Sequence, residues 1–145
     1  MKRSLPVFFI PRFKKLFFIT VFMGLLSACS TEQSGILGPQ QWQDLGFRVE
    51  ARPSPLRVGM NEFIVVASLG KYKPGVGLVV MLRVGENEEW RQAIQDGYTG
   101  VYRRAVKVDD PATQSLSVHV RRVKGDNEGD ETVLLFPLNQ KQAVQ

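Results

Sequence analysis

The chain has 145 residues, which is enough for one domain with its own hydrophobic core. It holds one cysteine and one histidine, which excludes an internal disulfide and a cysteine-ligated metal cluster. The formal charge is +5, but five of the 19 basic residues precede Leu16, and the rest of the chain carries equal numbers of basic and acidic residues. That balance removes the electrostatic basis for nucleic-acid binding.

The first 28 residues have the parts of a bacterial export signal. A basic head is followed by a mostly apolar segment over residues 16–26, which is shorter than the roughly twenty residues of a membrane span. Leu26-Ser27-Ala28-Cys29 then resembles the bacterial lipoprotein signal. The resemblance implies cleavage before Cys29 and attachment of lipid to its thiol. An uncleaved membrane helix and a plain secretory signal are the alternatives.

Residues 29–45 are expected to form the lipidated cysteine and a flexible tether. Residues 30–43 are polar, contain Gly and Pro and show no sustained period, which is typical of a linker. Trp42 is the exception, and we expect it to be the first residue that packs on the domain. Ser30 after the cysteine implies sorting to the outer membrane, facing the periplasm.

Short β-strands are predicted from residue 46 to residue 138. Residues 47–52 alternate, with Phe47, Val49 and Ala51 on one face. Residues 61–69 and 76–84 are apolar on both faces, as central strands are. Residues 101–108 place Tyr102, Val106 and Val108 together, and further strands are predicted over 115–123 and 131–138, where Leu116, Val118 and Val120 share a face.

The stretch 90–100 is ambiguous, because Trp90, Ala93 and Ile94 fit one helical turn as well as an edge strand that crosses to a second sheet. Six or seven short strands with frequent turn signals predict an all-β fold, an immunoglobulin-like antiparallel β-sandwich. A small barrel is the alternative. Residues 139–145 are expected to be a polar tail.

The domain also resembles the YtkA-like and FixH-like group of exported immunoglobulin-fold domains. The resemblance lies in a "P…L.VG.N.F.V" opening and a later "GxY" strand, carried here by Pro55, Leu56, Val58, Gly59, Asn61, Phe63 and Val65, then by Gly100, Val101 and Tyr102. It covers about 80 residues. Some members of the group are linked to copper handling or to the assembly of respiratory oxidases.

Metal ligands are scarce in this chain, and no metal or other cofactor is expected. Copper carriers of this type need surface clusters of His and Met, whose soft ligands select copper. After the leader the chain offers only His119, Met60 in a turn and Met81 in an apolar strand. We expect Met81 to fill the core and His119 to face outward beside Arg121.

Enzyme activity is not expected, because a hydrolytic site needs a nucleophile, a base and an orienting group close together. The chain has one His and no second Cys. Its acidic clusters at residues 109–110 and 126–130 are better explained as turn residues whose carboxylates bond their own backbone.

Basic side chains on two predicted strands are the candidate partner-binding residues: Arg103, Arg104, Lys107, Arg121 and Arg122, with Lys124 beyond them. If the two strands pair, these side chains form one basic band, which is either a solvated face or a docking patch. The sequence predicts a lipid-anchored, non-catalytic periplasmic adaptor that binds a protein partner. A periplasmic copper or small-ligand carrier, or an oxidase-assembly factor, is the alternative.

Overall fold

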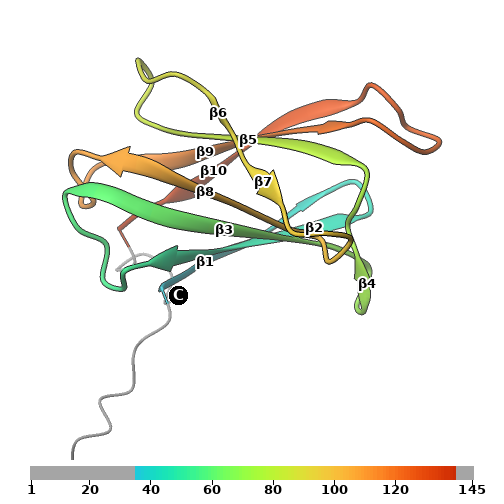
Figure 1. Cartoon of the computed structure of the whole chain (residues 1–145), viewed down its shortest axis with the longest axis horizontal. Coiled ribbons are helices and arrows are strands. Elements are labelled where there is room, and N and C mark those ends of the chain that lie inside the picture. Colours follow the sequence, from blue (N-terminus) through green and yellow to red (C-terminus); the bar gives the residue numbers. More distant parts are fainter. Residues whose placement is uncertain (1–34, 140–145) are drawn as a thin grey trace, which may run out of the picture. The chain divides into compact units, whose positions relative to one another are not determined.

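The computed structural model describes residues 35–139, and the predicted signal peptide, Cys29 and most of the polar tail lie outside this part. The described residues form ten strands and no helix (Figure 1). The strands are β1 (Gly35–Trp42), β2 (Leu45–Arg52), β3 (Gly59–Leu69), β4 (Lys73–Pro74), β5 (Leu78–Val84), β6 (Arg91–Gln92), β7 (Ile94–Gln95), β8 (Val101–Val108), β9 (Ser115–Arg122) and β10 (Glu131–Pro137). No helix in this part is long and apolar enough to cross a membrane.

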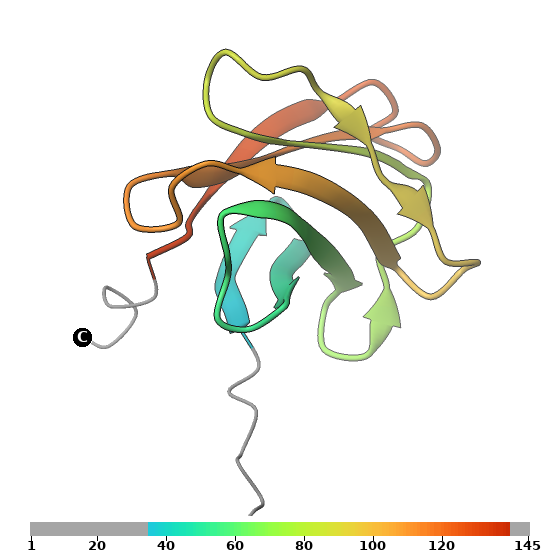
Figure 2. The same ribbon diagram turned by 60° about the vertical axis from the view of Figure 1, so that its left-hand side comes forward.

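The strands form two antiparallel sheets. Sheet A has the order β1-β2-β3-β8-β7, with β4 paired to one end of β3, and sheet B has the order β10-β9-β5-β6. Figure 2 shows the two layers facing each other. The order β2-β3-β8-β7 opposite β10-β9-β5 is that of the ABED and GFC sheets of an immunoglobulin-like sandwich. The predicted sandwich is confirmed, and the barrel alternative is excluded.

The core lies between the sheets and follows the predicted alternation. Phe47, Val49 and Ala51 on β2 are buried, as are Leu116, Val118 and Val120 on β9. Phe63, Phe136 and Leu82 are also inaccessible to solvent. Burial of such side chains contributes about 1.5–3 kcal/mol each, and this shared core sets the positions of both outer faces.

The ambiguous stretch 90–100 is an edge segment that changes sheets. β6 pairs with Met81 and Leu82 of β5 in sheet B, and β7 pairs with Tyr102 and Arg103 of β8 in sheet A. The edge-strand alternative is therefore confirmed. The strands β1, β4, β6 and β7 add to six predicted strands and make ten in all.

The tether prediction is wrong for residues 35–42. These residues form β1, which pairs with β2 from Gly35 opposite Ala51 to Trp42 opposite Leu45, with a register shift between Leu37 and Gln40. Leu37 is buried in the core, and Trp42 is partly buried against it. The prediction that Trp42 packs on the domain is confirmed. The packing of Leu37 and Trp42 against the core helps to hold the polar residues 35–42 in the sheet.

Asn61 explains the "VG.N" part of the sequence pattern. Its side chain is buried, accepts a hydrogen bond from the N–H of Arg57 at 3.0 Å, and donates to the carbonyls of Arg57 at 2.7 Å and Gly59 at 2.9 Å. These bonds satisfy the backbone of the turn that leads into β3. The residue type at this position is therefore set by the turn.

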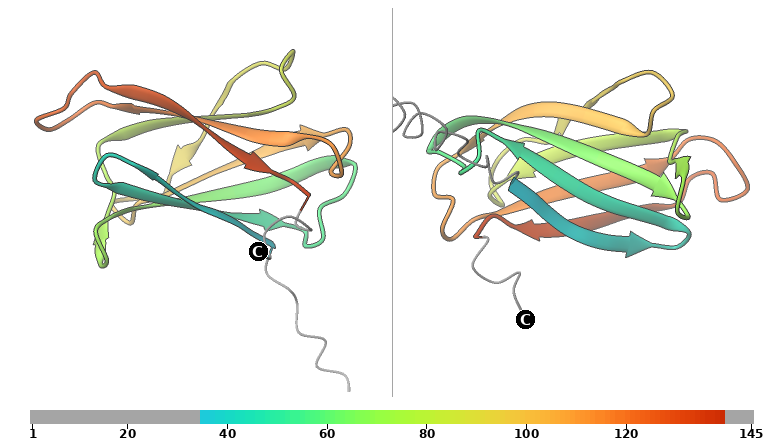
Figure 3. Two further views of the ribbon diagram at one scale, coloured as in Figure 1. Left: turned by 180° about the vertical axis from the view of Figure 1, so that it is seen from behind. Right: turned by 90° about the horizontal axis from the view of Figure 1, so that it is seen from below.

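The two ends of the sandwich differ in what they carry. The end at which β1 begins and β10 ends, which also carries the loop 109–114, is called the "terminal end". The "hairpin end" carries the turns 43–44, 70–72, 96–100 and 123–130 (Figure 3). The chain therefore enters and leaves the described domain at the terminal end, and the hairpin end lies opposite.

Candidate interaction surfaces

The predicted basic band does not form. β8 pairs with β3 and β7 in sheet A, whereas β9 pairs with β10 and β5 in sheet B. The alternation within strands that predicted the band does not reveal which strands are neighbours. Arg103 and Lys107 on the outer face of sheet A form ion pairs of 2.8 Å with Asp96 and Asp109, and Arg121 is exposed on sheet B.

Arg104 and Arg122 do not share the outer faces with the other basic residues. Both lie at positions that alternate in phase with the buried residues of their strands, and both are partly buried. The guanidinium of Arg122 lies 5.3 Å from the Trp42 ring centroid and donates to the Asp44 carboxylate. Arg122 therefore links β9 to the β1–β2 turn, which is a structural role.

Trp90 marks the outer face of sheet B. The Arg83 guanidinium lies 4.5 Å from the centroid of the indole, a cation–π distance. The His119 ring packs on Trp90 with centroids 5.6 Å apart, and its Nε2 lies 3.2 Å from Oε2 of Glu131. We call Trp90, Arg83, His119 and Glu131 the "Trp90 cluster".

Apolar side chains flank the Trp90 cluster. Val133 and Leu135 on β10 are 49% and 56% exposed. Met81 faces the cross-strand residue His119 and is only partly buried. The expectation that Met81 fills the core is therefore wrong, whereas the outward position of His119 is confirmed. These three residues and the Trp90 cluster together make the "sheet B face", a surface rich in the residue types of protein interfaces.

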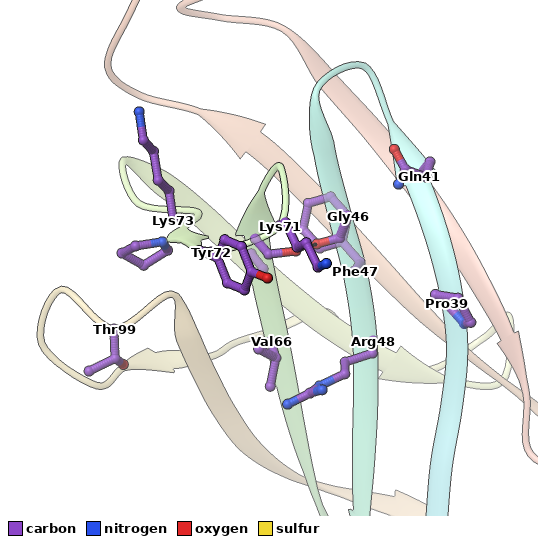
Figure 4. A pocket seen from close by; sticks show the side chains of 13 residues that line it. Pro39, Gln41, Gly46, Phe47, Arg48, Val66, Lys71, Tyr72, Lys73 and Thr99 are labelled. Atoms are coloured by element: carbon purple, nitrogen blue, oxygen red, sulfur yellow. Dashed lines mark hydrogen bonds between the residues drawn. The ribbon is translucent and has the colours of Figure 1, made fainter.

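A basic groove lies on the outer face of sheet A at the hairpin end (Figure 4). It has a volume of about 590 Å³, and its floor includes Gly46 and Ser68 of β2 and β3. Lys71, Tyr72 and Lys73 form one wall, and Pro39 and Gln41 of β1 line the opposite side. Arg48 reaches across the floor from β2.

The floor of the groove is braced from below. The buried hydroxyl of Tyr102 donates to the carbonyl of Gly75 at 3.0 Å. The Gly75 N–H donates to the carbonyl of Ala67 at 2.9 Å, and the Ala67 N–H donates to Gly100 at 2.8 Å. Burial raises the pKa of the Tyr102 hydroxyl above its ordinary value of 10.0, so this donor keeps its proton at physiological pH.

Among residues 35–139, two other groups have shifted pKa values, and both lie near the terminal end. The hydrogen bond from Lys107 to Asp109 raises the pKa of that ammonium. The pKa of Asp110 is lowered, first by the hydroxyl of Thr113 and then by the N–H of Ala112. Both groups are exposed partners of local turns. In residues 35–139, no three His, Cys, Asp or Glu side chains are grouped to hold a metal ion.

Comparison with protein families, with curated proteins and with solved structures gave no match. The candidate surfaces therefore rest on their own geometry. The sequence prediction missed both of them. Trp90 could have been noticed as a large aromatic residue within a polar stretch, and Lys71-Tyr72-Lys73 as a basic, aromatic turn.

Proposed function

We propose that this protein is a lipid-anchored, non-catalytic adaptor of the bacterial cell envelope, and that a protein partner docks on its sheet B face. The observation that carries the docking proposal is Trp90 held between Arg83 and His119 beside the exposed Val133 and Leu135. Trp and Arg dominate the binding energy of protein interfaces when they lie near the centre of an apolar patch.

The anchor proposal rests on the sequence around Cys29, which lies outside the described residues. Because β1 begins at Gly35, the five residues after Cys29 can span at most about 18 Å when fully extended. The terminal end of the domain is then held close to the lipid, and the hairpin end projects away from it. An outer-membrane anchor facing the periplasm is part of the proposal.

The anchor is tested by labelling with palmitate and by treatment with globomycin, which blocks the lipoprotein signal peptidase. We expect label on the wild-type chain, an unprocessed precursor under globomycin, and loss of the label from Cys29→Ala. A Cys29→Ala protein that still sediments with the outer membrane would contradict the anchor.

Docking is tested by photocrosslinking in native membranes. A photoreactive residue replaces Leu135 on the sheet B face or, as a control, Ile36, which is 47% exposed on the outer face of sheet A. We expect a discrete adduct from position 135 and none from position 36. Truncation Trp90→Ala should weaken partner retention by at least about tenfold, as a central interface tryptophan does.

The docking test has two controls. The Trp90→Ala chain should keep a cooperative thermal transition, because Trp90 lies outside the core. Charge reversal Arg103→Glu, on sheet A, should leave retention unchanged. Equal adducts from positions 135 and 36, or full retention by Trp90→Ala, would refute docking on the sheet B face.

A copper carrier is the second candidate, and one observation favours it. His119 and Met81 are cross-strand partners on the same outer face, and thioether is a soft ligand that selects copper(I), while imidazole also binds copper. Titration of the full chain with copper(I) tests this function. Stoichiometric uptake that is lost in both His119→Ala and Met81→Leu would support the carrier, and absence of uptake would dismiss it.

A further inference from the structure

We propose that the basic groove at the hairpin end binds an acidic, extended segment of a protein, at a site separate from the sheet B face. The groove lies on sheet A, whereas the Trp90 cluster lies on the outer face of sheet B. The two surfaces can therefore be tested independently.

The charge of the groove is the first argument. Its three charged lining residues are Arg48, Lys71 and Lys73, and no Asp or Glu of residues 35–139 lines it. The carboxylate of Glu50 lies 3.8 Å from the Arg48 guanidinium but does not line the groove. A hollow lined by one sign of charge concentrates the field and attracts a ligand of the opposite sign.

The shape of the groove is the second argument. Its floor is a sheet surface lowered by Gly46 and Ser68, and its walls are the turn 70–72 and the strand β1. Figure 4 shows Tyr72 and Lys71 standing over the floor and Arg48 lying along it. An open groove of about 590 Å³ suits a chain that lies across the surface better than an enclosed small molecule.

The hydrogen-bonding groups favour a peptide. Ser68 and Thr99 already donate their hydroxyl protons, to the carbonyls of Gly46 and Asp96, so their oxygens are oriented to accept from a ligand N–H. The Gln41 side chain adds one donor group and one acceptor at the opposite wall. Peptide N–H and C=O groups match this set, and carboxylates match the three cations.

The aromatic content of the groove argues against a glycan. Tyr72 is the one exposed ring in the lining, and the Lys71 ammonium lies 5.3 Å from its centroid. Recognition of a sugar chain by ring stacking needs a succession of free rings. Recognition here is led by charge, and the braced floor limits the reorganisation that binding requires.

The test measures fluorescence anisotropy of a labelled hexaglutamate peptide with the purified full chain in neutral detergent. Charge reversal of all three lining cations (Arg48→Glu, Lys71→Glu, Lys73→Glu) should weaken binding by at least about tenfold at low salt. The matched control reverses three basic residues outside the groove, Arg52→Glu, Lys107→Glu and Arg121→Glu, and should change binding less than about twofold. The variant Trp90→Ala should bind the peptide as the wild type does.

Four results would overturn the proposal. Equal losses of affinity in the groove variant and in the control would mean that net charge alone attracts the peptide. Equal affinity for hexaglutamine would mean that the groove does not recognise carboxylates. Tighter binding of a polyglucuronate of matched charge would assign the groove to a glycan. Binding to phosphatidylglycerol vesicles but not to the peptide would assign it to a lipid surface.

A melting curve for each variant, whose substitutions are all at exposed or half-exposed side chains, confirms that the fold is retained.

Discussion

The two ends of the sandwich are held by different kinds of contact. At the hairpin end, the backbone of Ala67, Gly75 and Gly100 is closely packed, and the buried Tyr102 hydroxyl completes the arrangement. At the terminal end, the loop 109–114 is held by exposed side chains: Gln114 accepts from the N–H groups of Asp109 and Asp110, both at 2.9 Å. The basic groove therefore depends on close packing, whereas the terminal loop depends on hydrogen bonds of surface side chains, among them the ionisable Asp110.

The largest expected effect comes from Gly100→Ala at the hairpin end. Gly100 has φ +74°, and a Cβ there would lie 2.5 Å from the carbonyl oxygen of Ala67 and 2.9 Å from the nitrogen of Gly75. Backbone must move to relieve this contact, so we expect a loss of about 3 kcal/mol in the free energy of unfolding. Chemical denaturation of the full chain measures it.

Gly97→Ala is the matched control for that substitution. Gly97 has φ +56°, but a Cβ there would meet no atom within 4 Å, so only the left-handed conformation is penalised, at about 1 kcal/mol. If the two variants lose equal stability, close packing is not what holds the hairpin end.

A smaller effect is expected from Tyr102→Phe, which removes the donor to Gly75 and costs about 1–2 kcal/mol. The pH dependence has a defined sign. Because the folded-state pKa of Tyr102 is raised above 10.0 by burial, its contribution to stability is present below pH 10.0 and is lost as the pH rises toward the folded pKa. Denaturation between neutral pH and pH 11 should show a weaker alkaline loss in Tyr102→Phe, and an unchanged slope would contradict the argument.

The smallest effect is expected from Asp110→Asn at the terminal end. The Asp110 carboxylate accepts from the Thr113 hydroxyl at 2.7 Å and from the Ala112 N–H at 2.9 Å, and its pKa is lowered from the ordinary value of 3.8. Its contribution is therefore present above pH 3.8 and is lost as the pH falls through the folded pKa. Acid titration of stability should be less steep in Asp110→Asn.

Thr113→Val provides the control for the terminal loop, because it removes the first cause of the lowered pKa and keeps the carboxylate. Like Asp110→Asn, it should make the free energy of unfolding fall less steeply as the pH is lowered. Neither Asp110→Asn nor Thr113→Val should alter the loss of stability above neutral pH that we assign to Tyr102. If either variant does, the two ends are not stabilised independently.

The sandwich was predictable because the strands with one buried face alternate cleanly. In β9, for example, Val118 and Val120 are separated by His119, which predicts that the two valines are buried and that His119 faces outward, as the structure shows. β1 was not predictable, because Gly38, Pro39 and two glutamines have little strand propensity. Its strand conformation comes from pairing with β2, and a partner in the sheet is not visible in the segment itself.

The candidate surfaces were less predictable than the fold. The basic band failed because alternation gives a side chain's face but not its neighbouring strand. Met81 was misplaced because the consecutive apolar residues of β5 carry no alternation, so nothing in the strand marks its outer side. Trp90 could not be assigned to a surface from the sequence, because its contacts with Arg83 on β5 and His119 on β9 form only in the folded chain.

The irregularity of β1 has a consequence for self-association of the domain. A sheet's outermost strand can recruit a strand of another molecule when it presents an unbroken row of N–H and C=O groups. Here the register shifts between Leu37 and Gln40, Pro39 has no N–H, and the Gln40 side chain donates to the carbonyl of Leu135 on β10. The two-residue strands β6 and β7 form the opposite sheet edges. The interrupted β1 and these two-residue strands are therefore poor templates for fibril-like pairing with another copy of the chain.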